Sequence, residues 1–145
     1  MKITICSSLD FTDKVKEVAD QLAQQNYKVT IPQTSERILN GEVTFEQIMK
    51  EKETGGISDR IIKYNCIKYY FEKIKEADAV LVLNLDKKGI KNYIGGAVFL
   101  EMGFAHILNK QIFLLNKIPQ VSYEHEIKGM QPIVLNGDLN KIKEI

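Results

Sequence analysis

The chain has 145 residues, of which 44% are hydrophobic and 27% charged, a balance typical of one soluble globular domain covering residues 1–145. Its net charge is +1 and its lysines are scattered among Asp and Glu, which argues against a nucleic-acid polymer or a membrane surface as partner. No apolar segment reaches the length of a membrane span and the N-terminus lacks the apolar stretch of a secretory signal, so we expect a cytoplasmic protein.

The first thirty residues predict a strand, a helix and a second strand. Residues 2–6 form a short apolar strand that Ser7-Ser8 break, and residues 11–25 carry apolar side chains on one face with charges opposite. Residues 27–31 predict the second strand, which Pro32 ends. Such a unit favours a right-handed crossover between parallel strands.

The pattern weakens between residues 33 and 58, a charged stretch with three glycines and a possible short helix over 44–52. This stretch is too long for an ordinary connection between a strand and a helix. Long loops of this kind are often lids or binding loops, but a disordered surface insertion is an equally good interpretation of the sequence. We therefore expect an insertion or lid over about 33–58.

The second half of the chain continues the alternation of helices and strands. We expect helices over 59–77, 97–108 and 138–145, and strands over 79–83, 111–115 and 133–135. Short strands rich in Val, Ile and Leu are typical of a parallel sheet covered on both faces. The predicted fold is therefore α/β, a doubly wound, flavodoxin-like or Rossmann-like sheet of five parallel strands in the order 2-1-3-4-5.

In such a sheet, ligands bind beyond the carboxyl ends of the strands, where the strand order reverses between strands one and three. The polar residues expected to converge there are Ser7, Ser8, Asn84, Asp86, Gly95 and Gly96. The serines and the amides after the two glycines can bind a phosphate or a sugar hydroxyl, although both segments also suit plain turns. Asp86 is a candidate second carboxylate, or part of a solvated turn.

One carboxylate, Glu101, lies within the apolar helix predicted over 97–108. An ionised carboxylate among apolar neighbours is costly unless it is paired, hydrogen-bonded or faces a cleft. The small neighbours Ala97 and Ala105, one turn away on either side, leave room for a ligand. The alternative is a Glu that faces water near the start of a helix, where it complements the helix dipole.

The sequence offers no metal site. His106 and His125 do not pair with each other or with a cysteine at ligand spacing. The two cysteines, Cys6 and Cys66, are expected to be reduced and buried as small hydrophobic residues.

Three segments carry a resemblance to a known family: EADAVLVLN (76–84), GG-x4-EMGFA (95–105) and NKQIFLLN (109–116). Together they resemble the nucleoside 2-deoxyribosyltransferase superfamily, which includes the deoxynucleoside 5′-monophosphate N-glycosidases. The superfamily hallmark is a Glu near a helix start followed by a hydrophobic residue, Gly, any residue and Ala. Glu101, Met102, Gly103 and Ala105 match it. Ahead of it, residues 92–97 read NYIGGA, where the transferases usually carry Asp and then Ser/Gly-Gly-Thr.

The resemblance implies that Glu101 attacks the anomeric carbon of a 2′-deoxynucleoside, after which a second base or water completes the reaction. Independently of the resemblance, the position of Asp86 after the third predicted strand makes it a candidate second carboxylate, as an acid or as a group that orients the ligand. No metal or organic cofactor is implied. Neighbouring subunits complete each other's sites in the superfamily, which makes Asn116 and Met130 candidate substrate contacts and a homodimer or larger homo-oligomer the expected assembly.

Three alternatives remain open: a nucleoside 5′-monophosphate N-glycosidase, a phosphoribohydrolase, and a non-catalytic nucleotide-binding module. Lys87, Lys88 and Lys91 follow the third predicted strand and suit a phosphate, but exposed loop lysines are often only solvated. Arg60 would add a contact if the insertion folds over the cleft. On balance the sequence favours an unphosphorylated 2′-deoxynucleoside.

Overall fold

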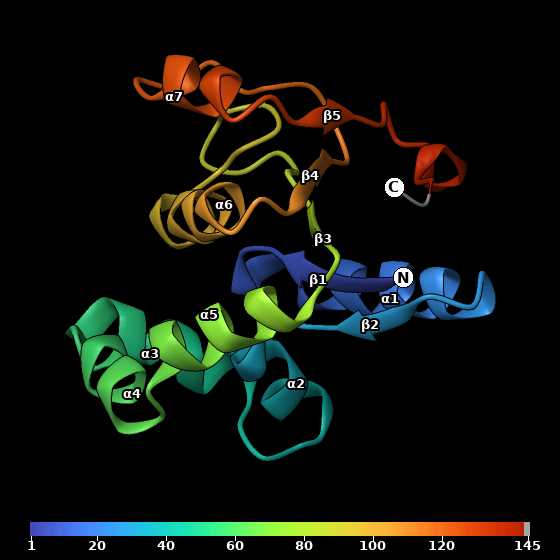
Figure 1. The fold of residues 1–145 in the computed structure, drawn as a ribbon. Helices are drawn as coiled ribbons and strands as arrows, with labels where there is room; N and C mark the ends of the chain where they lie inside the picture. Colours follow the sequence, from blue (N-terminus) through green and yellow to red (C-terminus); the bar gives the residue numbers. More distant parts are fainter. Residues whose placement is uncertain (144–145) are drawn as a thin grey trace.

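A computed structural model describes residues 1–143, and its centre is a sheet of five parallel strands. The strands are β1 (Lys2–Cys6), β2 (Lys28–Thr30), β3 (Ala79–Val82), β4 (Gln111–Leu114) and β5 (Ile133–Val134), in the spatial order β2-β1-β3-β4-β5. β1 lies between β2 and β3, pairing Thr4 with Thr30 on one side and with Val80 on the other. The predicted fold class and strand order are confirmed (Figure 1).

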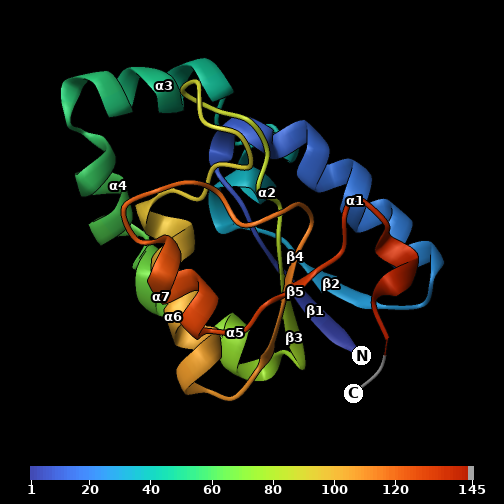
Figure 2. The same ribbon diagram turned by 90° about the horizontal axis from the view of Figure 1, so that it is seen from above.

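Helices cover both faces of this sheet. The connecting helices are α1 (Thr12–Gln24), α5 (Cys66–Glu76), α6 (Gly96–Ile107) and α7 (Glu124–Gly129), with short 3-10 turns η1 (Leu9–Phe11) and η2 (Leu139–Lys141). α1 and η2 cover one face, and α5, α6 and α7 cover the other (Figure 2). Among residues 1–143, no helix is both long and apolar enough to cross a membrane.

The strands divide their side chains between two cores with the period of two that a pleated strand imposes. In β3, Ala79 and Leu81 belong to the core beneath α1, whereas Val80 and Val82 belong to the core beneath α5 and α6. Ile5 and Cys6 divide in the same way at the end of β1. The last residue of β1 is thereby directed towards α6.

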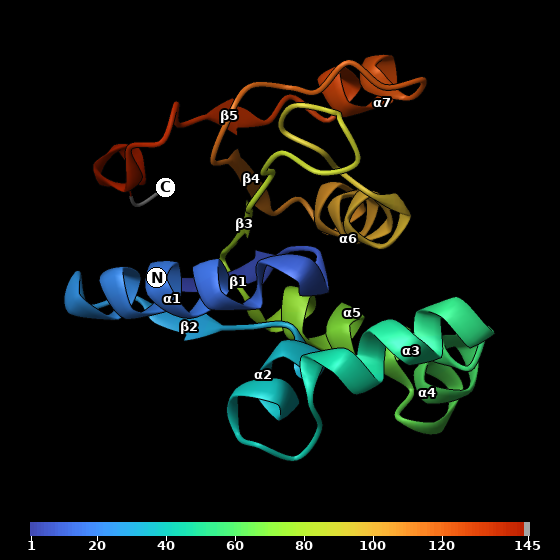
Figure 3. The same cartoon turned by 180° about the vertical axis from the view of Figure 1, so that it is seen from behind.

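The segment over 33–58 is helical and extends to residue 63 as α2 (Gln33–Leu39), α3 (Phe45–Thr54) and α4 (Ile57–Lys63). α3 begins with a capping box in which Thr44 accepts from the Gln47 backbone and the Gln47 side chain accepts from the Thr44 backbone. It ends at Gly55, whose φ of 80° only glycine adopts without strain. The three helices lie together beside α5, on the side of the molecule away from the β5 edge of the sheet and from α7 (Figure 3).

Two predicted elements differ from the structure. The helix expected over 59–77 is two helices, because Tyr64 and Asn65 interrupt it and Asn65 has a φ of 48°, a left-handed conformation that Asn tolerates. The closing helix expected over 138–145 is only the turn η2 within the described residues, and its last two residues lie outside them. α7 was not expected, because a helix of six residues carries too short a pattern to detect.

Candidate active site

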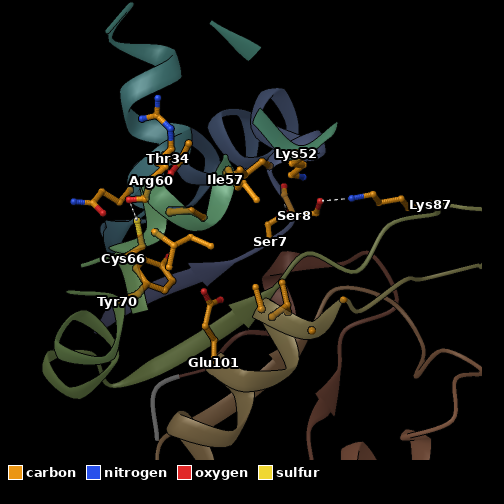
Figure 4. Close-up of a pocket in the computed structure, with 18 of the residues that line it drawn as sticks. Ser7, Ser8, Thr34, Lys52, Ile57, Arg60, Cys66, Tyr70, Lys87 and Glu101 are labelled. Atoms are coloured by element: carbon orange, nitrogen blue, oxygen red, sulfur yellow. Dashed lines mark hydrogen bonds between the residues drawn. The ribbon is translucent and has the colours of Figure 1, made fainter. Parts of the chain in front are cut away.

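A pocket of about 320 Å³ opens beyond the carboxyl end of β1, between α6 and the helices α2–α5 (Figure 4). Its volume is within the range of small-molecule sites. The following described residues line it: Ser7, Ser8, Leu9, Pro32, Gln33, Thr34, Lys52, Ile57, Arg60, Ile61, Cys66, Tyr70, Lys87, Tyr93, Gly95, Gly96, Ala97, Val98 and Glu101. The segment over 33–58 therefore contributes part of the pocket wall.

Glu101 reaches the pocket from the second turn of α6. Its Oε2 atom is buried and has no hydrogen-bond partner among the described residues. Burial raises the pKa of Glu101 from its ordinary value of 4.5 to about 8, and a hydrogen bond with the Cys6 thiol lowers it by a smaller amount. The protein itself therefore does little to stabilise the negative charge of this carboxyl group, which is available to a ligand.

The charge of Glu101 influences the pKa values of two buried groups, Cys6 and Tyr70. Cys6 is fully buried at the end of β1, and burial followed by the nearby Glu101 charge raises the pKa of its thiol. Tyr70 comes from α5, is 4% exposed, and donates its hydroxyl to the carbonyl of Ile5. Burial, then Cys6 and Glu101, raise the pKa of that hydroxyl, so both groups remain protonated donors at neutral pH.

Two lysines meet at the side of the pocket away from Glu101. Lys87 donates to Ser8 Oγ at 2.8 Å and lies 2.9 Å from an Asp10 carboxylate oxygen, and Lys52 of α3 approaches the other oxygen at 3.6 Å. Burial and then the Lys87 charge lower the pKa of Lys52. Burial raises the pKa of Asp10, but the two lysines bring it below its usual value. The cluster of Lys52, Lys87 and Asp10 keeps one uncompensated positive charge.

Arg60 is held in place by a second ion pair within the same segment. Its Nε and Nη2 atoms donate to the two oxygens of Glu51 at 2.6 and 2.8 Å, which joins α4 to α3. Two parallel bonds of this kind fix the guanidinium plane. Arg60 therefore contributes chiefly to holding the pocket wall together.

Five of the residues expected at the site line this pocket together: Ser7, Ser8, Gly95, Gly96 and Glu101. Gly95 precedes α6, and none of the described side chains caps the helix, so its first amides are open to a ligand. A Cβ atom on Gly95 would come within 3.1 Å of the Tyr93 ring, so a larger residue there requires that ring to shift.

Four other expected residues are not among the described residues that line the pocket: Asn84, Asp86, Asn116 and Met130. Asn84 is fully buried, donates to the carbonyls of Asn116 and Lys117 at 3.0 and 2.9 Å, and accepts from the Asn116 amide. Asn116 returns a bond to the Asn84 carbonyl. Asp86 accepts from the Asn92 amide at 2.9 Å within its own loop. Met130 lines a separate apolar groove on α6.

Sequence reasoning did not assign Cys6, Lys52, Cys66 or Tyr70 to the site. Cys66 and Tyr70 follow helical apolar spacing, so they were interpreted as core, and Lys52 is one of many lysines in a charged segment. Within the described part of the chain, no group of three or more His, Cys, Asp or Glu side chains is placed to hold a metal ion.

Comparison with known proteins finds a likeness in structure. Neither a family model nor a curated protein sequence matches the chain. Among solved structures, the chain is similar to the CMP N-glycosidase BcmB of Clostridium botulinum, with a TM-score of 0.52 and 16% sequence identity over 92% of this chain and 84% of that one. At this identity the likeness shows a shared fold.

Proposed function

We propose that this protein cleaves the N-glycosidic bond of a nucleoside or nucleotide, with Glu101 as the nucleophile. The observation that carries the proposal is a buried, unpartnered carboxyl oxygen at the wall of a ligand-sized pocket, at the point where the strand order reverses. The shared fold with a CMP N-glycosidase and the match of Glu101 to the superfamily hallmark support the same chemistry.

The reaction requires the ionised form of Glu101. One carboxylate oxygen attacks the anomeric carbon, the bond between that carbon and the base nitrogen breaks, and the base leaves with the electron pair and takes a proton from solvent. Water or a second base then attacks the anomeric carbon and gives up a proton to solvent, and the bond to Glu101 breaks, which restores the carboxylate. Positive charge develops on the sugar in both steps, and a carboxylate in a site of low polarity stabilises it strongly. No cofactor is needed.

The cluster of Lys52, Lys87 and Asp10 favours a substrate with a 5′-phosphate, in contrast to the unphosphorylated deoxynucleoside that the sequence favoured. Lys87 and Ser8 are already in contact, and Lys52 adds a second cation from α3. The open amides at the start of α6 provide further donors for an anion. A nucleoside 5′-monophosphate presents its phosphate and its anomeric carbon at opposite ends of the sugar, which suits cations across the pocket from Glu101 (Figure 4).

One assay tests both the cleavage of the N-glycosidic bond and the preference for a 5′-phosphate. The purified protein is incubated with a panel of nucleosides, 2′-deoxynucleosides and their 5′-monophosphates, and the released base is measured with and without an acceptor base. We expect base release, faster from a monophosphate than from its nucleoside. Release only when an acceptor is present would identify a transferase. No release from any member, by a protein that nevertheless binds nucleotides, would identify a binding module instead.

A matched variant ties the chemistry to the residue. Glu101→Gln keeps the size of the side chain but cannot attack the sugar, so it should bind the substrate and release no base. Base release by this variant at the wild-type rate would rule out the nucleophile role.

A further inference from the structure

Buried polar atoms without a hydrogen-bond partner are rare in folded proteins, and in this protein they gather at the pocket. Among the described residues, three buried side-chain atoms lack a partner: Gln33 Oε1, Arg37 Nε and Glu101 Oε2. Gln33 and Glu101 both line the pocket. The proposed reaction uses Glu101 but gives no role to Gln33. An unpartnered amide at a pocket wall points to a ligand that completes its hydrogen bonds.

Gln33 belongs to the first turn of α2, three residues beyond the end of β2. It therefore lies beyond the carboxyl ends of the strands, where ligands bind in a sheet of this kind. Its side chain makes no hydrogen bond to any other described residue, so the oxygen and the nitrogen of its carboxamide are both unused. The two groups are nearly equal in size, and a half-turn of the amide exchanges them at little steric cost.

The pocket presents its functional groups in the order in which a nucleotide carries its own. Lys87 lies at one end of the pocket, and Thr34 and Tyr70 lie at the other (Figure 4). Glu101 comes from the wall between the two ends (Figure 4). Gln33 is the chain neighbour of Thr34 and belongs to the second end. A nucleotide with its phosphate at Lys87 and its anomeric carbon at Glu101 therefore extends its base towards Gln33.

We infer that Gln33 is a specificity-determining residue, whose carboxamide hydrogen-bonds the polar edge of the nucleobase. Its oxygen accepts from an N–H of the base, and its nitrogen donates to the neighbouring ring nitrogen or carbonyl. Nucleobases present donors and acceptors side by side, and a Gln side chain pairs with such an edge through two parallel hydrogen bonds. The inference rests on the proposed function for the identity of the ligand.

Arg37 provides the competing explanation. It lies one turn beyond Gln33 on α2, and a bond between Gln33 Oε1 and Arg37 Nε would satisfy both atoms and give Gln33 a structural role only. The guanidinium of Arg37 is held elsewhere, however. Its Nη1 donates to Glu42 at 3.1 Å, and its central carbon lies 4.1 Å from the centroid of the Tyr64 ring. These two contacts leave the Gln33 amide for the pocket.

The test compares a nucleotide with the same molecule without its base. Isothermal titration calorimetry measures the dissociation constants of the four common ribonucleoside 5′-monophosphates and of ribose 5-phosphate, in a Glu101→Gln background that cannot consume them. We expect Gln33→Leu to weaken the tightest nucleotide by about three- to tenfold and to leave ribose 5-phosphate unchanged, because Leu has a similar size but no hydrogen-bonding group. Gln24→Leu is the matched control, because Gln24 is exposed on α1 and does not line the pocket.

Equal weakening of the nucleotide and of ribose 5-phosphate, together with a lower melting temperature, would identify the structural pair with Arg37 and overturn the inference. Unchanged binding of the nucleotide in Gln33→Leu, or no binding of any nucleotide by the background protein, would also overturn it.

Base release by the wild-type protein is measured separately. Nucleotide binding that depends on Gln33 without base release would remove the proposed reaction and leave the inference standing. Base release with no selective effect of Gln33→Leu would do the reverse.

Discussion

At the scale of the residue, Glu101 is a carboxyl group in an environment that disfavours its ionised form. A carboxyl group with a buried oxygen that has no partner among the described residues destabilises the folded protein when it is ionised, and such groups are often part of a functional site. We predict that Glu101→Gln reduces turnover by a factor on the order of 10³ or more while circular dichroism remains unchanged. Activity close to wild type in the folded variant would contradict the assignment.

The same residue predicts how stability depends on pH. The Glu101 pKa of about 8 in the folded protein is higher than the ordinary value of 4.5 expected on unfolding. Between these values the folded state holds a proton that the unfolded state has lost, so this contribution to stability is complete below about pH 4.5 and disappears as pH rises to about 8.

Glu101→Gln removes that dependence. Relative to wild type, the free energy of unfolding of the variant should increase between pH 5 and pH 9, by on the order of a few kcal/mol. Urea unfolding of both proteins at these two pH values measures the difference. A constant difference would mean that Glu101 titrates near its ordinary pKa in the folded protein.

Asn84 shows the opposite case, a polar side chain whose hydrogen bonds are all satisfied internally. Its side-chain amide joins Asn84, two residues beyond β3, to Asn116 and Lys117 after β4 through two donated bonds and one accepted bond. We predict that Asn84→Ala lowers the free energy of unfolding by about 2–4 kcal/mol. The KM for substrate, measured at a temperature where the variant is folded, should stay near the wild-type value. A large rise in KM without loss of stability would instead support the substrate contact predicted from the sequence.

At the scale of the element, α3 and α4 determine the chemistry of one side of the pocket. α3 carries Lys52 into the pocket, and the fork from Arg60 to Glu51 keeps α3 and α4 together. We propose that α3 and α4 form a lid and that Lys52 of this lid binds the substrate phosphate. The sequence suggested a lid over this stretch but gave no reason to select Lys52 from its other lysines.

We predict that Lys52→Ala raises KM for a nucleoside 5′-monophosphate by about tenfold or more and leaves KM for the matching nucleoside nearly unchanged. Lys50→Ala is the matched control, because Lys50 is exposed on the same helix and does not line the pocket. Steady-state kinetics of the three proteins on both substrates measure the effect. Equal losses for nucleoside and monophosphate would mean that Lys52 supports the wall and does not bind phosphate.

At the scale of the whole molecule, the outer face of α6 is apolar where a monomer would be expected to be polar. Ile107 and Leu100 are 79% and 43% exposed, and they border a groove lined also by Phe99, Phe104 and Met130. Apolar surface of this kind commonly packs against a second copy of the chain. We therefore propose a homodimer through α6; the resemblance implies a homodimer or a larger homo-oligomer.

We predict that Ile107→Glu shifts the protein from dimer to monomer in sedimentation equilibrium at micromolar concentration. Ile62→Glu is the control, because Ile62 is 76% exposed on α4, away from this groove. A wild-type protein that sediments only as a monomer would contradict the assembly.

The sequence by itself determined the sheet and the position of its main carboxylate. Runs such as 79–83 are apolar enough to be buried on both faces, and the alternation with helices leaves few ways to order five parallel strands. The glycine pair at the start of α6 and the serines after β1 are also local signals, because each can be recognised from the residues directly next to it in the sequence. The residues selected by these signals line one pocket: Ser7, Ser8, Gly95, Gly96 and Glu101.

Only the tertiary structure decided which distant residues share the pocket with that carboxylate. Lys52, Cys66 and Tyr70 come from α3 and α5, and no local pattern distinguishes them from core or surface residues. The structure likewise shows Asn84 and Asn116 bonded to each other, which residue type alone cannot indicate. Contacts between distant segments depend on how helices pack against the sheet, and periodicity within one segment carries no information about that packing.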